Sequence, residues 1–304
     1  MIRVLCTVVV LAVLSATQAA QQLITVDVDL VNIYFTVCNK QGRLVANLDR
    51  AHFAVYEDDN PQVITHFSRE ADLPLRLALL IDTSGSVRYK LPFEQDAAVA
   101  FLNSTLRPGV DEASVVTFDS SIDVRQNYTA DRELLASTVR RTRSGGGTRL
   151  YDALSFLLNG TLAGGDSRRA IILLTDGADN ASRDSPVEVL EAAQRNNVAI
   201  YSVSLNSIGI PSDESNGRDS ILEMFGTETG GKACFPKRLK DLSSQLASIR
   251  KELRSQYTIA YRSTNDKRDG AYRKIRIDVK NTEYSVHARS GYYAPTLVTT
   301  RGAE

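Results

Sequence analysis

The pattern of apolar and polar positions changes twice along the chain. Before about residue 70, apolar residues alternate with polar ones in short runs, as in residues 24–30 and 33–37. Clusters of turn-forming residues separate the runs, at 39–42 and 58–61. Alternation with a period of two is typical of half-buried strands. We therefore expect β structure over residues 21–70.

From Leu75 to about Leu253 the pattern becomes one of strands interleaved with helices. Continuous apolar runs at 75–81 and 170–175 predict strands buried on both faces of a parallel sheet. Further strands are expected at 114–118, 198–204 and 232–235, with an edge strand at 122–127, and helices at 97–106, 132–140, 150–162, 186–196, 220–229 and 239–253. This order predicts an α/β fold with a doubly wound, mostly parallel sheet covered by helices.

After Arg254 the alternation returns, and strands are expected at 257–261, 275–279 and 284–288. Neither terminal β segment would bury enough surface alone. A single small β-sandwich, into which the α/β domain is inserted, is therefore favoured over two separate β modules. The predicted organisation is a leader at 1–20, an N-terminal β segment at 21–70, an α/β domain at 71–253, a C-terminal β segment at 254–295 and a tail at 296–304.

The first buried run ends in three oxygen-bearing side chains, Asp82, Ser84 and Ser86, spaced two residues apart. Open α/β sheets bind ligands at the carboxyl ends of their strands. Hard divalent cations prefer oxygen ligands, and hydroxyls with one carboxylate leave such an ion under-neutralised. The ion could then capture an acidic group from a partner. The alternative is that a serine merely caps the following helix.

Two later stretches bear on that choice. A glycine-rich loop at 144–147 presents Thr148 just before a helical pattern, and the second buried run ends at Asp176. If the two buried strands are neighbours, their ends and this loop form one oxygen-lined pocket.

These three segments resemble the metal-ion-dependent adhesion site (MIDAS) of the von Willebrand factor type A (VWA) domain, in order, spacing and flanking structure. The resemblance implies a Rossmann-like VWA fold and a divalent cation, Mg²⁺ or else Mn²⁺ or Ca²⁺. Its implied site is Asp82, Ser84, Ser86, Thr148 and Asp176, with hydroxyls that can ligate directly and aspartates that often act through water. Asp179 and Asp119 could lie in the outer shell around the metal's ligands. Alternatively, they could simply be solvated loop residues. The N-terminal segment also resembles one that precedes such domains in exported bacterial proteins.

The first twenty residues predict export. Arg3 precedes an apolar run at 4–14 and small residues at 15–20, which is typical of a cleaved signal peptide. We expect a secreted or periplasmic protein, with membrane attachment only if this segment is retained. Two cysteines remain afterwards, Cys38 and Cys234. An oxidising compartment permits a bridge between them, but buried free thiols are favoured.

The composition excludes several other classes of function. The formal net charge is zero, which predicts no basic face for nucleic acid. The three histidines, His52, His66 and His287, all lie outside the α/β domain, so a Ser-His-Asp hydrolase would lack its base. We therefore expect a non-enzymatic adhesion module without a small-molecule substrate, whose protein partner supplies an Asp or Glu carboxylate. The rival hypothesis is a structural or assembly protein whose ion only orders the loops.

Overall fold

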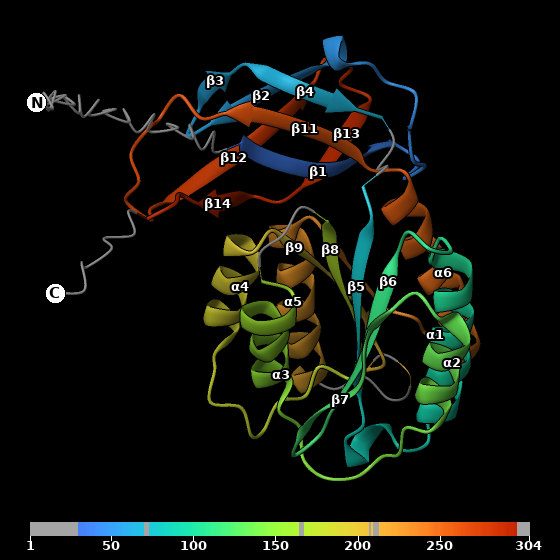
Figure 1. Cartoon of the computed structure of the whole chain (residues 1–304). Coiled ribbons are helices and arrows are strands. Elements are labelled where there is room, and N and C mark those ends of the chain that lie inside the picture. The colour runs from blue at the N-terminus through green and yellow to red at the C-terminus, as the bar shows by residue number, and fades with distance from the viewer. Residues whose placement is uncertain (1–29, 70–72, 164–166, 207, 209–212, 297–304) are drawn as a thin grey trace, which may run out of the picture.

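The computed structural model describes residues 30–69, 73–163, 167–206, 208 and 213–296. The predicted signal peptide, the alternating run before residue 30 and nearly all of the predicted tail lie outside these residues. The described chain forms a β-sandwich that sits on one end of an α/β domain (Figure 1).

The α/β domain contains a six-stranded sheet in the order β10-β9-β8-β5-β6-β7. Its strands are β5 (Leu75–Asp82), β6 (Glu112–Phe118), β7 (Ile122–Thr129), β8 (Arg168–Thr175), β9 (Val198–Ser204) and β10 (Lys232–Cys234). Only the edge strand β7 pairs antiparallel within this sheet. The chain leaves β5 toward β6 on one side and later returns to β8 on the other. The boundary between β5 and β8 is therefore the switch point at which such sheets bind ligands.

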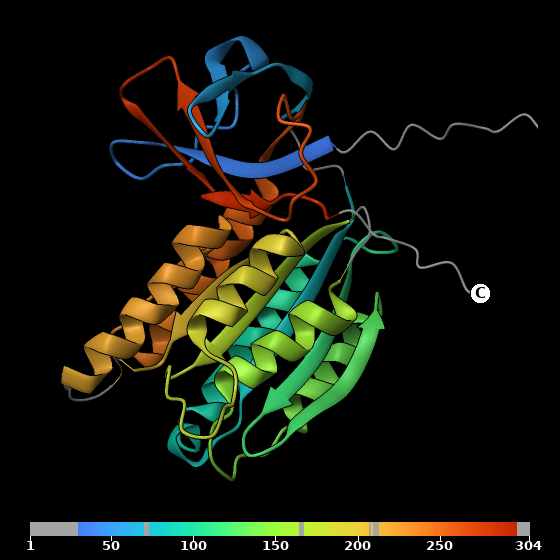
Figure 2. The same cartoon turned by 90° about the vertical axis from the view of Figure 1, so that its left-hand side faces the viewer.

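Helices cover both faces of this sheet (Figure 2). One face carries α1 (Leu91–Thr105), α2 (Arg132–Arg140) and α6 (Leu242–Arg254), and the other carries α3 (Leu150–Phe156), α4 (Pro186–Arg195) and α5 (Asp213–Thr229). Alternate residues of β5 enter the two cores, Leu77 and Leu79 on the α1 side and Ala78 and Leu80 on the α3 side. Burial on both faces explains why this strand reads as one apolar run.

The sandwich is built from both ends of the chain. Its strands are β1 (Leu30–Asn39), β2 (Phe53–Glu57), β3 (Asn60–Gln62), β4 (Ile64–Ser68), β11 (Tyr257–Arg262), β12 (Tyr272–Val279), β13 (Tyr284–Ala288) and β14 (Gly291–Tyr293). They form two sheets, β13-β1-β11-β4 and β14-β12-β2-β3, each of which mixes N- and C-terminal strands. Phe35, Phe53 and Tyr257 pack between them with ring centroids 5.1–5.4 Å apart. The predicted single sandwich is confirmed, and the alternative of two separate β modules is wrong.

Several elements differ from the sequence-based expectation. Helix α1 begins at Leu91 rather than at residue 97, and Asn60 and Pro61, expected in a turn, belong to strand β3. Helix α5 begins at Asp213 rather than at residue 220; acidic residues suit the positive end of a helix, so a polar stretch need not be a loop. Helix α3 ends at Phe156, and Leu157–Thr161 form a wider π-type turn around Asn159 and Gly160, which are poor helix formers. Strand β14 is too short to produce an alternating pattern.

Two further observations concern the described residues. No helix among the described residues is long and apolar enough to cross a membrane. Cys38 and Cys234 are both free thiols, which agrees with the expectation against a bridge.

Candidate metal centre

The first candidate loop follows β5 at the switch point. The buried carboxylate of Asp82 accepts a hydrogen bond from the backbone N–H of Ser84 at 2.9 Å and one from the Thr175 hydroxyl, at the end of β8, at 2.7 Å. The hydroxyls of Ser84 and Ser86 lie 2.9 Å apart. Ser84 is buried and Ser86 is exposed. The two serines therefore form a short path of oxygens from the buried carboxylate to the surface.

The glycine-rich loop at 144–148 is tied directly to the first loop. The Gly145 N–H donates to the Thr83 carbonyl at 2.7 Å, and the Gly85 N–H donates to the Gly146 carbonyl at 3.2 Å. Gly146 has a φ of +80°, and a Cβ there would lie 2.7 Å from the Ser120 hydroxyl. Glycine is therefore required at this point for both backbone angle and space.

The third loop follows β8 and closes the group. Asp176 is buried, and its carboxylate accepts a hydrogen bond from the Ala178 N–H at 3.1 Å. The Asn180 side chain accepts from the Thr148 N–H at 2.9 Å, and the Asn180 N–H donates to the Thr148 carbonyl at 3.1 Å. Asp82, at the end of β5, and the other four residues named from the sequence, on three loops, are thus brought to one edge of the sheet by hydrogen bonds between these segments.

The two additional aspartates have structural partners. Asp179 accepts hydrogen bonds from the Ser182 hydroxyl at 2.5 Å and from the Tyr151 N–H at 3.2 Å, so it fixes the start of α3. Asp119 accepts from the Ser121 N–H at 2.9 Å and from the Thr83 hydroxyl at 3.3 Å. Asp119 therefore contacts the first loop, whereas Asp179 holds its own loop against α3.

The electrostatics of the site favour a cation. Burial raises the pKa of Asp82 to about 6, hydrogen bonds from Ser84 and Thr175 lower it only in part, and the neighbouring Asp176 raises it further. Within the described residues no group of three or more His, Cys, Asp and Glu side chains could hold a metal. The donor set is instead two carboxylates and three hydroxyls, all oxygen, which fits a hard divalent ion.

A third acid lies beneath the site and was not identified from the sequence. Glu94 of α1 is 1 % exposed, and neither of its carboxylate oxygens has a hydrogen-bond partner. Burial raises its pKa well above the ordinary value, with Asp82 and Asp176 adding repulsion. The sequence feature that could have identified Glu94 is its position three residues after Leu91, which places it on the core-facing side of the helix.

Glu94 makes the metal-free protein sensitive to pH. Because its folded-state pKa is raised, its contribution to stability is largest below pH ~4.5 and is lost as pH rises through the folded pKa. We expect Glu94→Gln to stabilise the metal-free protein by on the order of 1 kcal/mol at pH 8 and by almost nothing at pH 4. Urea unfolding at both pH values measures this, with Glu133→Gln, an exposed position in α2, as the control. An equal effect of Glu94→Gln at both pH values would contradict it.

Comparisons with known proteins agree with this fold. The sequence model of the von Willebrand factor type A domain matches residues 77–252, more than half of the 304-residue chain. Proteins of this family are generally adhesion or interaction modules rather than enzymes. No curated protein sequence matches the chain.

Several solved structures match the chain at low identity. Proximal thread matrix protein 1 from the mussel byssus is 20 % identical, with a TM-score of 0.51, over 60 % of this chain and 49 % of that one. The chain thus spans about half the length of that relative. A second structure of that protein, at a TM-score of 0.50 and 20 % identity over 60 % of this chain and 48 % of that one, has a zinc-occupied MIDAS motif. A von Willebrand factor type A protein from Catenulispora acidiphila is 14 % identical over 89 % of this chain and 74 % of that one, with a TM-score of 0.49. On the strength of the family match, this chain belongs to the von Willebrand factor type A domain family.

Proposed function

We propose that this chain is an exported binding protein whose VWA domain captures an acidic group of a partner protein through a divalent cation, most simply Mg²⁺. The ion would be held by Asp82, Ser84, Ser86, Thr148 and Asp176. When bound, it supplies an electrophilic centre that accepts a carboxylate oxygen from the partner. The proposal rests mainly on one observation: hydrogen bonds join the three loops to one another around two buried aspartates, Asp82 and Asp176.

Some residues of the site fix the Asp82 carboxylate, and others would donate oxygen atoms to the ion. The Thr175 hydroxyl and the Ser84 N–H each hold one oxygen of Asp82, which fixes the carboxylate without neutralising it. The hydroxyls of Ser84, Ser86 and Thr148 are neutral donors. An ion held mainly by neutral oxygens keeps much of its charge and can therefore attract a further carboxylate.

A purely structural role for the ion is less well supported. The loops are already joined by direct bonds, namely Gly145 to Thr83, Gly85 to Gly146 and Asn180 to Thr148. An ion is therefore not needed to hold them in place.

Two exposed aromatic side chains follow the first loop and suit partner contacts. Tyr89 is 87 % exposed and Phe93 at the start of α1 is 50 % exposed. Tyrosine is enriched among the residues that dominate binding energy at interfaces. We infer that the partner presents an apolar surface beside its carboxylate.

Metal affinity is expected to fall sharply in mild acid. The ion requires an ionised Asp82, whose pKa burial raises to about 6. Below pH 6 the proton competes with Mg²⁺, so the association constant should drop about tenfold per pH unit. Isothermal titration of the metal-free protein between pH 5 and 7.5 measures this. Affinity unchanged down to pH 5 would contradict the assignment of Asp82.

The test of the function is a metal-dependent capture experiment. Exported proteins from the source cell are passed over the immobilised protein in Mg²⁺, in Zn²⁺ or without metal, and the captured protein is then retested after its carboxyl groups are converted to amides. We expect capture only with metal and loss of capture after amidation. Capture that survives metal removal would refute the proposal, and so would capture that survives amidation.

A further inference from the structure

A second candidate site lies at the other end of the α/β domain, where it meets the sandwich. A pocket of about 380 Å³ opens there. It is near the start of β8, at Arg169, whereas the metal loops follow the end of the same strand. Its walls come from the start of β1, the end of α4, the loop between β11 and β12, and strands β12 and β14. The pocket is therefore closed only when both parts of the protein are folded and docked.

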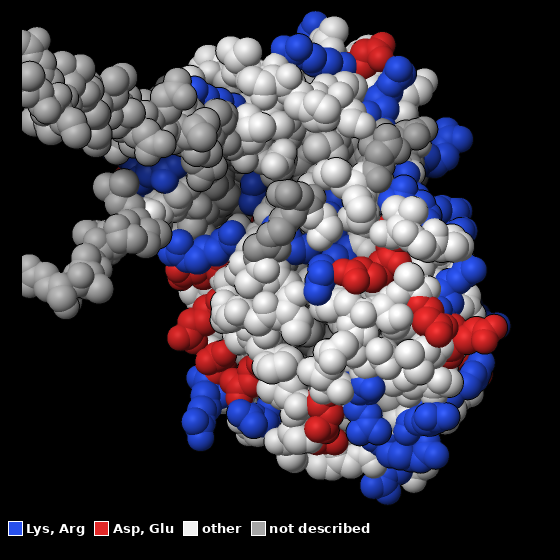
Figure 3. Space-filling view, in the orientation of Figure 1, with Lys and Arg blue, Asp and Glu red and all other residues white. Residues whose placement is uncertain are grey.

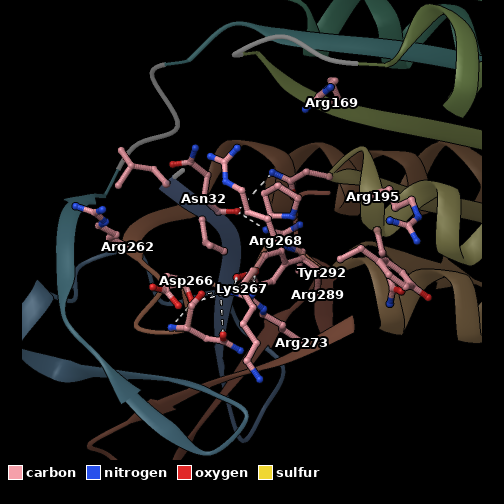
Figure 4. A pocket seen from close by; sticks show the side chains of 18 residues that line it. Asn32, Arg169, Arg195, Arg262, Asp266, Lys267, Arg268, Arg273, Arg289 and Tyr292 are labelled. Carbon is pink, nitrogen blue, oxygen red and sulfur yellow. Dashed lines mark hydrogen bonds between the residues drawn. The ribbon is translucent and has the colours of Figure 1, made fainter. Parts of the chain in front are cut away.

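The lining of this pocket is strongly cationic although the whole chain is neutral. Figure 3 shows Lys and Arg side chains along the junction of the two parts, and Figure 4 shows the labelled cations around the pocket, on β8, α4 and the sandwich. The lining contains a single acid, Asp266, among the cations Arg169, Arg195, Arg262, Lys267, Arg268, Arg273 and Arg289. Such an excess of one charge attracts ligands of the opposite charge.

Two of the cations are already neutralised within the protein. Arg273 is buried beside Glu57 at 3.5 Å. Arg195 pairs with Glu191 at 2.7 Å and stacks 4.0 Å from the Tyr293 ring. These two arginines therefore shape the walls, and the attraction for a ligand must come from others.

Arg289 is the cation of this pocket whose surroundings most clearly point to a ligand. It follows β13 and is 7 % exposed. Its Nη2 donates to the Asn32 carbonyl at 2.9 Å, but its buried Nε has no hydrogen-bond partner. In the described part of the chain it forms no ion pair with a carboxylate; its neighbours are tyrosines, and Tyr292 lies 5.6 Å from the guanidinium. Burial accordingly lowers the pKa of Arg289 to about 10. A buried cation without a counter-ion is costly unless a ligand supplies one.

Two exposed cations stand at the rim of the same pocket. Arg262 ends β11 and Lys267 lies in the loop that follows, and both side chains are exposed. Together with Arg289 they place positive charge at the mouth and on the floor. Guanidinium groups bind phosphate and carboxylate oxygens through paired hydrogen bonds.

We propose that this pocket binds a small multivalent oxyanion, a molecule that carries two or more phosphate or carboxylate groups, with Arg289 on its floor and Arg262 and Lys267 at its rim. The volume suits a ligand of that size rather than a single ion, since ligand pockets commonly measure about 300–1,000 Å³. The three named cations belong to the sandwich, whereas Arg169, Gln194 and Asn197 line the pocket from the VWA domain, so the ligand would lie at the junction of the two parts. The site is independent of the metal centre.

The test uses the signal-peptide-free protein, stripped of metal over a chelating resin so that no ion at the other site can bind the probe. Pyrophosphate and citrate are titrated by calorimetry at low salt, and the tighter of the two identifies phosphate or carboxylate as the preferred group. We expect saturable one-site binding that weakens at least tenfold in the rim double variant Arg262→Gln/Lys267→Gln. The control double variant Arg125→Gln/Lys251→Gln removes the same charge from exposed positions elsewhere and should bind as the wild type does. No saturable binding of either anion, or equal losses in both double variants, would overturn the proposal.

Arg289→Met separates a ligand role from a packing role. If Arg289 is held for a ligand, the variant should fold, melt at or above the wild-type temperature without anion, and lose the rise in melting temperature that the anion gives. A variant that melts lower without anion but binds the anion normally would show that Arg289 serves packing, and would overturn the assignment. A variant that fails to fold leaves the rim double variant as the deciding measurement.

Discussion

Asp82→Asn is expected to abolish magnesium binding and yet leave the metal-free protein more stable. The amide keeps the shape of the side chain: its oxygen can accept from the Ser84 N–H, and its NH₂ can donate to the Thr175 hydroxyl. What is lost is the negative charge that the ion requires. Burial raises the pKa of Asp82 to about 6, so the ionised form weakens the metal-free fold, and the effect grows from pH ~4 until it is complete above pH 6. Removal of that charge should stabilise the metal-free protein at pH 7.5 by on the order of 2 kcal/mol.

Two measurements on one preparation check this expectation, calorimetric titration with Mg²⁺ and urea unfolding without metal. Asp96→Asn is a suitable control, because Asp96 lies exposed on α1 and pairs with Arg140 at the surface. The control should bind Mg²⁺ normally, with stability changed by less than ~0.5 kcal/mol. If Asp82→Asn instead destabilises the metal-free protein, the carboxylate is a structural element of the loops. If Asp82→Asn still binds Mg²⁺, the proposed metal site is wrong.

Gly231→Ala is expected to prevent stable folding. Gly231 connects α5 to β10, and a Cβ at this position would lie 1.9 Å from the Ile200 carbonyl oxygen in the middle of β9. The clash is with backbone inside a sheet, so no side chain can rotate to relieve it. The Gly231 carbonyl also contacts the His287 ring from the sandwich, so a shift here would disturb the junction as well. We expect a loss of more than about 4 kcal/mol, or no soluble protein.

The matched control is Gly217→Ala within α5, where a Cβ would meet nothing within 4 Å. Alanine there should stabilise the protein by up to ~1 kcal/mol, since glycine weakens helix interiors. Urea unfolding of both variants, with circular dichroism for helix content, makes the comparison. Wild-type stability of Gly231→Ala would show that β9 and the α5–β10 connection are farther apart than described.

The candidate metal site could be proposed from the sequence because its residues follow the ends of two strands. The apolar run of β5 predicts burial on both faces, and parallel strands place Asp82 and Asp176 at the same edge. Only the adjacency of β5 and β8 had to be assumed, and the strand order confirms it. The assignment of metal ligands stays a prediction.

Other features could not be predicted because they depend on contacts between distant segments. Glu94 looks like an ordinary helix acid until the packing of α1 buries it under the site. The cationic pocket collects side chains from segments that are far apart in the sequence, from Arg169 to Arg289. Local periodicity carries no information on such pairings, since it reports only which face of an element is apolar.

The insertion of one domain into another separates the paired strands of the sandwich widely in the sequence. Strand β1 pairs with β11 in a register that joins Leu30 to Arg262. A ribosome adds about 5–20 residues per second, so the partner of β1 is made roughly 10–50 seconds after β1 itself. During that interval the whole α/β segment becomes available and, with its more local strand pairings, can fold first. The N-terminal strands meanwhile have unpaired edges, which are prone to aggregation. Strand β1 can therefore complete its pairing only after β11 and β13 have been made.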